Sequence, residues 1–226
     1  MLPEIGVVLD AGTGMFRVRD LIQTDSLAIF VTHAHLDHSI GLTFLFDVVR
    51  ETNVRNVRVY AEPTKIDALR GHLFHEQLFP VMPPIDFRPL AADRPVELPG
   101  GGGLIAIPLE HPCGSVGFRL DWPGHSMAYI TDTTADLDAG YVAKIRQVDL
   151  LVHECYFPDG EEERARITGH SCLTPVVEVA RQAQVKRLAL VHTNPLDLEL
   201  KMLDLEAARK IFSNIVLPND GDSVEF

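Results

Sequence analysis

Residues 32–38 read Thr32-His33-Ala34-His35-Leu36-Asp37-His38, so three imidazoles and one carboxylate lie close together in the chain. Imidazole nitrogen and carboxylate oxygen are ligands that suit zinc, manganese or iron. In an extended turn His33 and His35 point the same way, whereas Asp37 and His38 start the next helix and can point at a second ion. Four donors at this spacing predict a metal site rather than a polar loop with incidental histidines.

Three further donors stand at the ends of predicted strands, namely His111, Asp132 and His192. A single His or Asp at the end of a strand often only caps a turn. Polar side chains that follow several neighbouring strands, however, lie together at one edge of the sheet. Two metal ions need about seven protein ligands, with one of them shared. Together with residues 33–38 these donors complete such a set, so the sequence predicts two divalent ions. Zinc is expected, and manganese and iron also accept these ligands.

The rest of the chain alternates between apolar runs rich in β-branched residues and helix-like stretches. The predicted strands are Gly6–Leu9, Leu27–Thr32, Val57–Ala61, Leu104–Leu109, Val116–Asp121, Met127–Thr131, Leu150–Glu154 and Arg187–His192. The predicted helices are Ile40–Glu51, Pro63–Leu73, Leu137–Gln147, Pro175–Gln184 with Thr174 as its N-cap, and Leu205–Asn214. The Pro-rich stretch Phe79–Pro89 is expected to be a surface loop. This alternation predicts layered α/β packing, and by itself it leaves open a doubly wound sheet or two sheets between helices.

Length and composition limit the function classes. A chain of 226 residues without a linker predicts one α/β domain over residues 1–226. The net charge of -12 excludes a domain-wide basic surface for nucleic acid, although it leaves room for a small basic patch. The sparse cysteines Cys113, Cys155 and Cys172 predict reduced thiols in a cytoplasm. No apolar run reaches the roughly 20 residues that span a bilayer, so no membrane is expected.

The order of the motifs resembles the metallo-β-lactamase superfamily: His-x-His-x-Asp-His, then His111, then Asp132 in Tyr129-Ile130-Thr131-Asp132-Thr133, then His192. The detail is similar to the ribonuclease Z and small phosphodiesterase branch. The segments that carry this likeness are Val8-Leu9-Asp10-Ala11-Gly12-Thr13-Gly14, Leu150-Leu151-Val152-His153-Glu154, Gly169-His170-Ser171, Val185-Lys186-Arg187-Leu188 to His192, and a closing strand at Asp220-Gly221-Asp222-Ser223-Val224.

The resemblance implies a four-layer αβ/βα sandwich, with two mixed sheets flanked by helices. It implies that one ion is held by His33, His35 and His111, the other by Asp37, His38 and His192, and that Asp132 bridges them. It also implies that Asp37, His170 and Glu154 take part in catalysis. In that scheme His170 donates a proton and Glu154 orients it, which agrees with the effect of a carboxylate on an adjacent imidazole. Asp10 is expected to support the metal loop or to cap a turn.

Three features depart from the ribonuclease Z pattern. The interval between His111 and Asp132 is filled by two predicted strands, so no long tRNA-gripping arm fits there. The Arg expected a few residues after His192 is missing, and Thr193-Asn194-Pro195-Leu196 stands in its place. The family's first β-hairpin is also missing, or the sequence is shortened at the front. The sheet edge exposed in this way predicts a homodimer.

The favoured function is a two-metal phosphodiesterase for a small cyclic or short-chain phosphodiester. A tRNA 3′-end endonuclease is an alternative, and the acidic charge and the missing arm make tRNA an unlikely partner. A lactone, thioester or β-lactam hydrolase is a further alternative that Gly169-His170-Ser171 does not favour. A non-catalytic metal-binding module is disfavoured because all seven ligand positions are filled.

Overall fold

The chain folds into two compact units. The computed structural model describes residues 1–91, 94–196 and 203–226. The first unit comprises Met1–Arg94 with Leu98–Gly100, and the second comprises Pro95–Glu97 with Gly101–Phe226. Whether the two units act as one domain over residues 1–226 stays a prediction.

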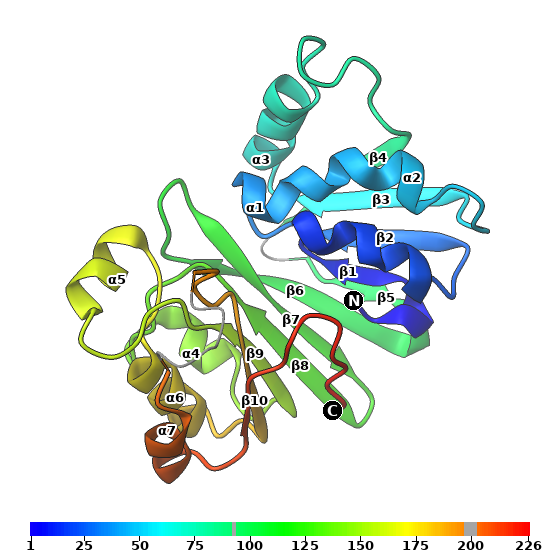
Figure 1. Ribbon diagram of the computed structural model, residues 1–226. Helices are drawn as coiled ribbons and strands as arrows, with labels where there is room; N and C mark the ends of the chain where they lie inside the picture. Colours follow the sequence, from blue (N-terminus) through cyan, green and yellow to red (C-terminus); the bar gives the residue numbers. More distant parts are fainter. Residues whose placement is uncertain (92–93, 197–202) are drawn as a thin grey trace. The chain divides into compact units, whose positions relative to one another are not determined.

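The first unit is built on a parallel sheet with the strand order β1-β2-β3-β4 (Figure 1). Its strands are β1 (Val7–Leu9), β2 (Ser26–Phe30), β3 (Asn56–Ala61) and β4 (Ile85–Pro89). The prediction that both sheets are mixed is therefore wrong for this one. Every strand lies beside its predecessor in the chain, and right-handed crossovers between such strands all fall on one face of the sheet.

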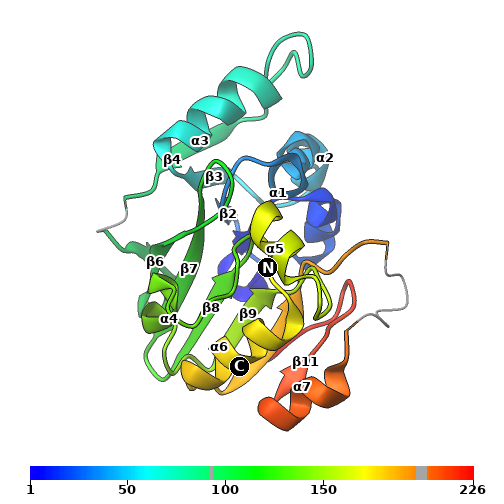
Figure 2. The same ribbon diagram turned by 90° about the vertical axis from the view of Figure 1, so that its left-hand side faces the viewer.

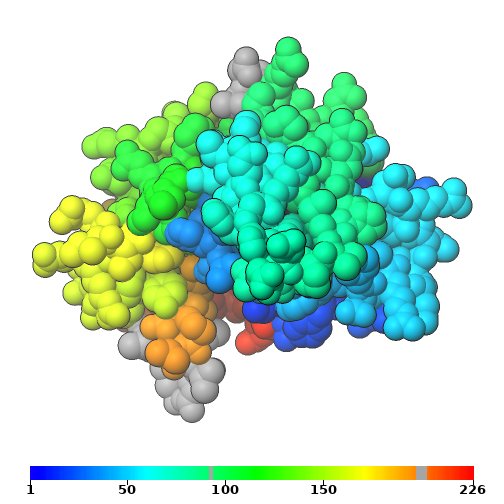
Figure 3. Space-filling model, turned by 90° about the horizontal axis from the view of Figure 1, so that it is seen from above, coloured from blue at the N-terminus to red at the C-terminus, as the bar shows by residue number. Residues whose placement is uncertain are grey.

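Helices supply those crossovers and pack on the sheet. They are η2 (Thr13–Leu21), α1 (Leu36–Ser39), η3 (Ile40–Phe44), α2 (Leu45–Val48), α3 (Pro63–Ala68) and η4 (Leu69–Leu73), whereas the short η1 (Pro3–Ile5) precedes β1. Met15 of η2, Leu45 of α2 and Leu69 of η4 join Ile29 and Val59 of the sheet in one buried core. The chain after η4, which includes exposed Leu78, lies on the outer surface of this unit (Figure 3).

The second unit contains a seven-stranded mixed sheet with the order β11-β10-β9-β8-β7-β6-β5. Its strands are β5 (Val96–Leu98), β6 (Gly102–Leu109), β7 (Ser115–Trp122), β8 (His125–Ile130), β9 (Leu150–Glu154), β10 (Arg187–Val191) and β11 (Ile215–Val216), with the short η5 (Pro99–Gly101) after β5. Strands β6, β7 and β8 are antiparallel, whereas β8 to β11 are parallel. A tight turn at Pro123 and Gly124 joins β7 to β8, so a short hairpin fills the interval before Asp132, as predicted.

Helices α4 (Gly140–Lys144), α6 (Leu173–Gln182) and α7 (Leu205–Ile211) cover one face of this sheet (Figures 1 and 2). Val176, Val179 and Ala180 of α6 form the apolar face predicted for that helix. The predicted N-cap is wrong, because α6 begins at Leu173 after Cys172 and Thr174 instead donates to the Asp159 carboxylate. The remaining helix, α5 (Glu162–Thr168), is not among the predicted ones.

Several predicted boundaries need correction. The stretch Phe79–Pro89 is not all loop, because β4 occupies its end as an edge strand, where proline is tolerated. The closing strand predicted at Asp220–Val224 is wrong, because a turn at Asn219–Asp222 lies there, where Asn219 N–H donates to the Asp222 carboxylate. Cys113, Cys155 and Cys172 are thiols, of which Cys113 is exposed and the other two are buried. Within the described residues, no helix has the length and apolarity needed to cross a membrane.

Candidate metal centre

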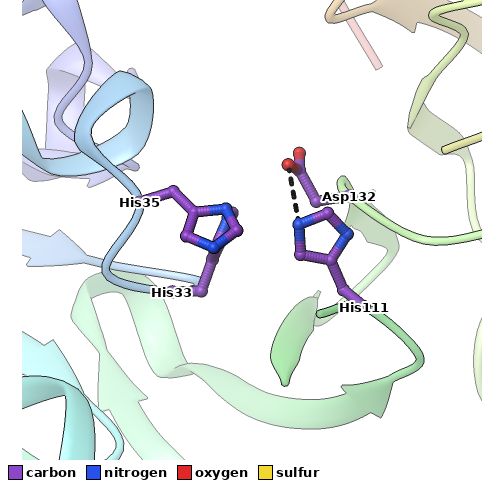
Figure 4. Close-up of side chains that lie close together, drawn as sticks. All are labelled: His33, His35, His111 and Asp132. Carbon is purple, nitrogen blue, oxygen red and sulfur yellow. Dashed lines mark ion pairs between the residues drawn. The ribbon is translucent and has the colours of Figure 1, made fainter. Parts of the chain in front are cut away.

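The first unit presents four predicted ligands on the segment that follows β2. His33 and His38 are buried, and Asp37 is exposed. The His33 ring centroid lies 4.4 Å from that of His35 and 4.4 Å from that of His38. Figure 4 shows His33 and His35 leaving this segment as neighbours. The local sequence therefore gathers three imidazoles and one carboxylate, as predicted.

Two glycines allow this segment to pack closely on the loop after β1. A Cβ atom on Gly12 would lie 2.2 Å from the Asp37 carbonyl oxygen, and one on Gly41 would lie 2.2 Å from the Gly12 carbonyl oxygen. Such distances leave no room for any side chain. Backbone hydrogen bonds from Ala11 N–H to the His38 carbonyl and from Gly41 N–H to the Ala11 carbonyl tie the two segments together.

Asp10 fixes the orientation of His38. Its carboxylate accepts hydrogen bonds from the Thr32 N–H at 2.8 Å and from the Thr32 hydroxyl, and one oxygen lies 2.8 Å from His38 Nδ1. The residue has a φ of 58°, in the left-handed region that Asp tolerates better than most residues. Since Nδ1 is engaged, His38 presents Nε2, which lies 3.5 Å from an Asp37 oxygen. Asp10 is therefore the support of the metal loop that the sequence suggests.

In the second unit, Asp132 lies between two predicted ligands. His111 Nε2 lies 3.5 Å from Asp132 Oδ2, and His192 Nε2 lies 3.5 Å from Asp132 Oδ1 (Figure 4 shows the first pair). Asp132 and His192 follow β8 and β10 with φ values of 49° and 52°. Non-glycine residues held in this region cluster at functional sites.

His111 is held from behind by Gly169. Its Nδ1 lies 2.9 Å from the Gly169 carbonyl oxygen, so this nitrogen carries the proton and Nε2 presents its lone pair. Gly169 has a φ of 75°, and a Cβ atom there would lie 2.7 Å from His111 Nδ1. Glycine is therefore required both by the backbone and by the close approach of the imidazole.

In three pairs of predicted ligands, the imidazole nitrogen and the carboxylate oxygen lie 3.5 Å apart, and this distance shows whether the residues fit a metal ion. Hydrogen bonds from N–H to oxygen cluster at about 2.7–3.2 Å. Two ligand atoms bonded to one tetrahedral zinc at about 2.1 Å lie about 3.4 Å apart. The pairs Asp37–His38, His111–Asp132 and His192–Asp132 all have the second spacing. The donor sets in both units therefore fit divalent metal ions, and each Asp132 oxygen has its own imidazole.

Glu154 and His170 form a different kind of pair. His170 Nδ1 lies 3.2 Å from Glu154 Oε1, within hydrogen-bond range, and Glu154 is fully buried. The two carboxylate oxygens also accept the N–H groups of Thr133 at 2.7 Å and Ser171 at 3.1 Å. Burial raises the pKa of Glu154, and the hydrogen bond with His170 opposes that rise. Glu154, His170 and His192 have donor atoms close enough to hold an ion, and both Glu154 oxygens are already engaged by these hydrogen bonds.

The neighbouring His153 has a structural role. Its Nδ1 donates to the Glu154 carbonyl oxygen at 2.8 Å, and its Nε2 accepts from the Tyr141 hydroxyl at 3.1 Å. Burial lowers the pKa of His153 to about 4 and raises the pKa of Tyr141. His153 is therefore a neutral imidazole at neutral pH.

Two residues near His170 are missing from the predicted site. The buried Ser171 hydroxyl donates to the Thr133 carbonyl oxygen at 2.6 Å and accepts from Ala135 N–H at 2.9 Å, which ties the two loops together. Tyr156 stacks on the His170 ring, with centroids 5.0 Å apart. Ser171 belongs to a motif that the sequence already singles out, whereas no sequence pattern marks Tyr156.

Comparisons with known proteins identify the family of this chain. A family model described as the beta-lactamase superfamily domain matches residues 7–193. The ribonuclease Z of Halorubrum lacusprofundi is 38% identical over 104 residues, which are 46% of this chain and 33% of that protein. The ribonuclease Z of Microcystis aeruginosa is 27% identical over an alignment that covers 89% of this chain and 79% of that protein. The first curated relatives are thus matched over about a third of their own length.

A solved structure, the metallo-beta-lactamase fold protein YhfI from Bacillus subtilis, has a TM-score of 0.76 and 16% identity to this chain. The likeness covers 96% of this chain and 85% of that one. At this identity it shows the fold alone. The fold class predicted from the sequence is confirmed.

Proposed function

We propose that this chain, which belongs to the beta-lactamase superfamily, is a two-metal phosphodiesterase that acts on a small cyclic or short-chain phosphodiester. The family predicted from the motif at residues 33–38 is confirmed by the matching family model. The observation that carries the proposed function is the pair of 3.5 Å separations that give each oxygen of Asp132 its own imidazole. A carboxylate placed in this way suits a bridging ligand.

The proposed ligand set is the one that the sequence motifs imply. His33, His35 and His111 hold one ion, Asp37, His38 and His192 hold the other, and Asp132 is shared. Support comes from the geometry inside each unit, where Asp37 and His38 have ligand spacing and Asp132 has it twice. Zinc is the proposed metal, because nitrogen-rich sets with carboxylates suit it well, and manganese and iron remain alternatives.

When bound, two divalent ions polarise phosphoryl oxygens and lower the pKa of a water molecule. Proton donation and the orientation of the ligands are the tasks of the protein's own residues. His170 protonates the departing oxygen through Nε2, because Glu154 engages its Nδ1. Glu154 keeps the imidazole in place, since Thr133 and Ser171 hold the carboxylate by their backbone N–H groups. Asp10 and the Gly169 carbonyl fix the tautomers of His38 and His111 in the same way.

A small substrate is proposed because two features weigh against tRNA. Its net charge is -12, and a short hairpin fills the interval between His111 and Asp132. A second candidate is a tRNA 3′-end endonuclease, which the names of the ribonuclease Z relatives favour. The homodimer expected from the sequence also stays a prediction, and light scattering over a range of concentrations tests it.

One experiment separates these functions. Protein with a measured zinc content is assayed against cyclic nucleotides, cyclic sugar phosphates and a precursor tRNA. We expect turnover of a small phosphodiester and no specific tRNA cleavage, with activity that follows the zinc content. Asp132→Asn should abolish the activity, whereas Asp138→Asn, at an exposed position in the same loop, should retain it. Cleavage of the precursor tRNA alone would establish the second candidate, and activity that survives Asp132→Asn would indicate a contaminant.

A further inference from the structure

Tyr156 lies beside the proposed acid, two residues beyond Glu154. The residue is half-buried and follows the end of β9. Its ring stacks on the His170 ring, with a centroid distance of 5.0 Å and an interplanar angle of 22°. It also contacts the His192 ring at 5.8 Å and the Phe157 ring at 4.9 Å. Tyr156 is therefore in ring contact with both the proposed acid and a proposed ligand.

The hydrogen bond that His170 donates to Glu154 restrains only one edge of the imidazole. It engages Nδ1 and leaves the imidazole able to tilt about the line that joins the two side chains. A contact with the ring face removes that freedom. His170 has two stacked ring contacts, with Tyr156 and with His192 at a centroid distance of 5.4 Å, and two edge contacts, with His111 and Phe157. Because His192 is a proposed metal ligand, Tyr156 is the stacked ring that has no assigned task.

We propose that Tyr156 is a positioning residue that fixes the ring plane of His170, so that Glu154 and Tyr156 together aim its Nε2. This inference rests on the proposed function, because it assigns His170 the role of an acid. The aromatic ring carries the effect and the hydroxyl group does not, since the contact with His170 is a stack of two rings. Aromatic pairs prefer offset-stacked or edge-to-face geometry over a face-to-face sandwich, and such a contact stabilises one orientation of the two rings.

A measurement that needs no activity tests the contact directly. Ring protons of His170 are observed by NMR in protein labelled at histidine nitrogen, and His170→Ala identifies the signal. In Tyr156→Leu the His170 ring protons should move downfield, because the shielding above an aromatic face is lost. Tyr156→Phe should leave them near their wild-type position. Unchanged His170 signals in Tyr156→Leu would overturn the proposal.

Kinetics of the same variants test the positioning role. Tyr156→Leu should lower kcat on a substrate with a poor leaving group about two- to tenfold, which is the size expected for one aromatic pair. KM and zinc content should stay at wild-type values, and Tyr156→Phe should restore kcat. The matched control is Tyr60→Leu, which removes a half-buried tyrosine stacked on Phe30 in the first unit and should leave kcat unchanged.

Two results would contradict this role. A loss in Tyr156→Phe as large as that in Tyr156→Leu would mean that the hydroxyl group acts on the substrate. A loss of zinc in Tyr156→Leu would mean that the ring supports His192 instead. A wild-type protein without hydrolase activity would refute the proposed function, whereas the NMR measurement would still decide whether Tyr156 orients His170.

Discussion

The two units supply their proposed ligands in opposite ways. In the first unit His33, His35, Asp37 and His38 lie on one short segment, and local packing against Gly12 and Gly41 shapes it. In the second unit the ligands are far apart in sequence, and the sheet brings them together. In the parallel register, Ile130 pairs with His153 and Val191 pairs with Glu154, so the residues after β8 and β10 emerge at the same edge.

This difference separates two ways to lose a metal site. A change in the first unit removes donors from one segment and leaves the sheet of the second unit intact. A change in the second unit acts on donors whose proximity depends on that whole sheet. Asp132 is the extreme case, because its two oxygens serve two different imidazoles.

The largest expected effect is that of Asp132→Ala compared with Asp37→Ala. Loss of the shared ligand should remove both ions and abolish hydrolysis, because each ion loses a donor. Asp37→Ala should lose one ion equivalent and keep the other, since only one proposed site contains it. Elemental analysis after gel filtration measures both. Equal metal loss in the two variants would show that Asp132 does not bridge, and a wild-type protein with one ion would refute the two-metal assignment.

The next effect concerns His170, which lies in the second unit but outside the ligand set. His170→Ala should keep both ions and lose about 10²–10⁴-fold in turnover of a substrate with a poor leaving group, as expected for a general acid. The loss should be smaller on a nitrophenyl ester, because a good leaving group needs little protonation. Steady-state rates on the two substrates measure it. An equal loss on both would mean that His170 binds phosphate instead of donating a proton.

The sequence predicts the contiguous ligands more directly than the scattered ones. His33 to His38 form a pattern by themselves, whereas His111, Asp132 and His192 become convincing only because each ends an apolar strand. Tyr156 could not be predicted, since its contact with His170 joins positions without any shared motif. The strand β4 could not be recognised because Pro83 and Pro84 stand directly before it, Pro89 ends it, and only Phe87 within it is buried.

Helix α5 shows a signal that sequence reasoning could have used. Glu162 and Glu163 stand in its first turn, where negative charge favours the helix dipole. Gly169 ends the helix in the left-handed conformation, with its N–H donating to the Ala165 carbonyl oxygen. His170 therefore follows the end of one helix and precedes α6, a placement that the Gly-His-Ser motif alone does not reveal.

Lowering the pH tests how much the burial of a neutral His153 in β9 contributes to the stability of the second unit. Burial lowers the pKa of His153 from 6.5 to about 4, so the unfolded chain binds a proton at pH values where the folded chain does not. The contribution of the neutral His153 side chain to the free energy of unfolding is therefore fully present above pH 6.5. It falls by about 3 kcal/mol as the pH is lowered towards 4. Urea unfolding of metal-free protein between pH 7 and 4 measures this loss.

In His153→Gln the same series should show a shallower fall of the unfolding free energy, although the variant is less stable at pH 7. The exposed His125→Gln serves as the control and should keep the wild-type slope. A parallel slope in His153→Gln and wild type would mean that His153 does not contribute to acid unfolding.

The smallest expected effect is that of Gly169→Ala, which asks whether the fold of the second unit holds His111 in place. The substitution has two costs, a left-handed backbone at φ 75° and a Cβ atom 2.7 Å from His111 Nδ1 and 2.6 Å from Pro112 Cδ. Gly160→Ala is the matched control, because Gly160 has a φ of 96° and open space around the position of a Cβ atom. Both variants carry the backbone strain, and only Gly169→Ala displaces the imidazole.

Loss of a group that orients a ligand typically weakens metal affinity about 10–100-fold. Competition with a chelator should therefore show a loss in that range for Gly169→Ala and wild-type affinity for Gly160→Ala. Similar metal affinity in the two variants would mean that His111 is positioned by its own strand end and not by Gly169.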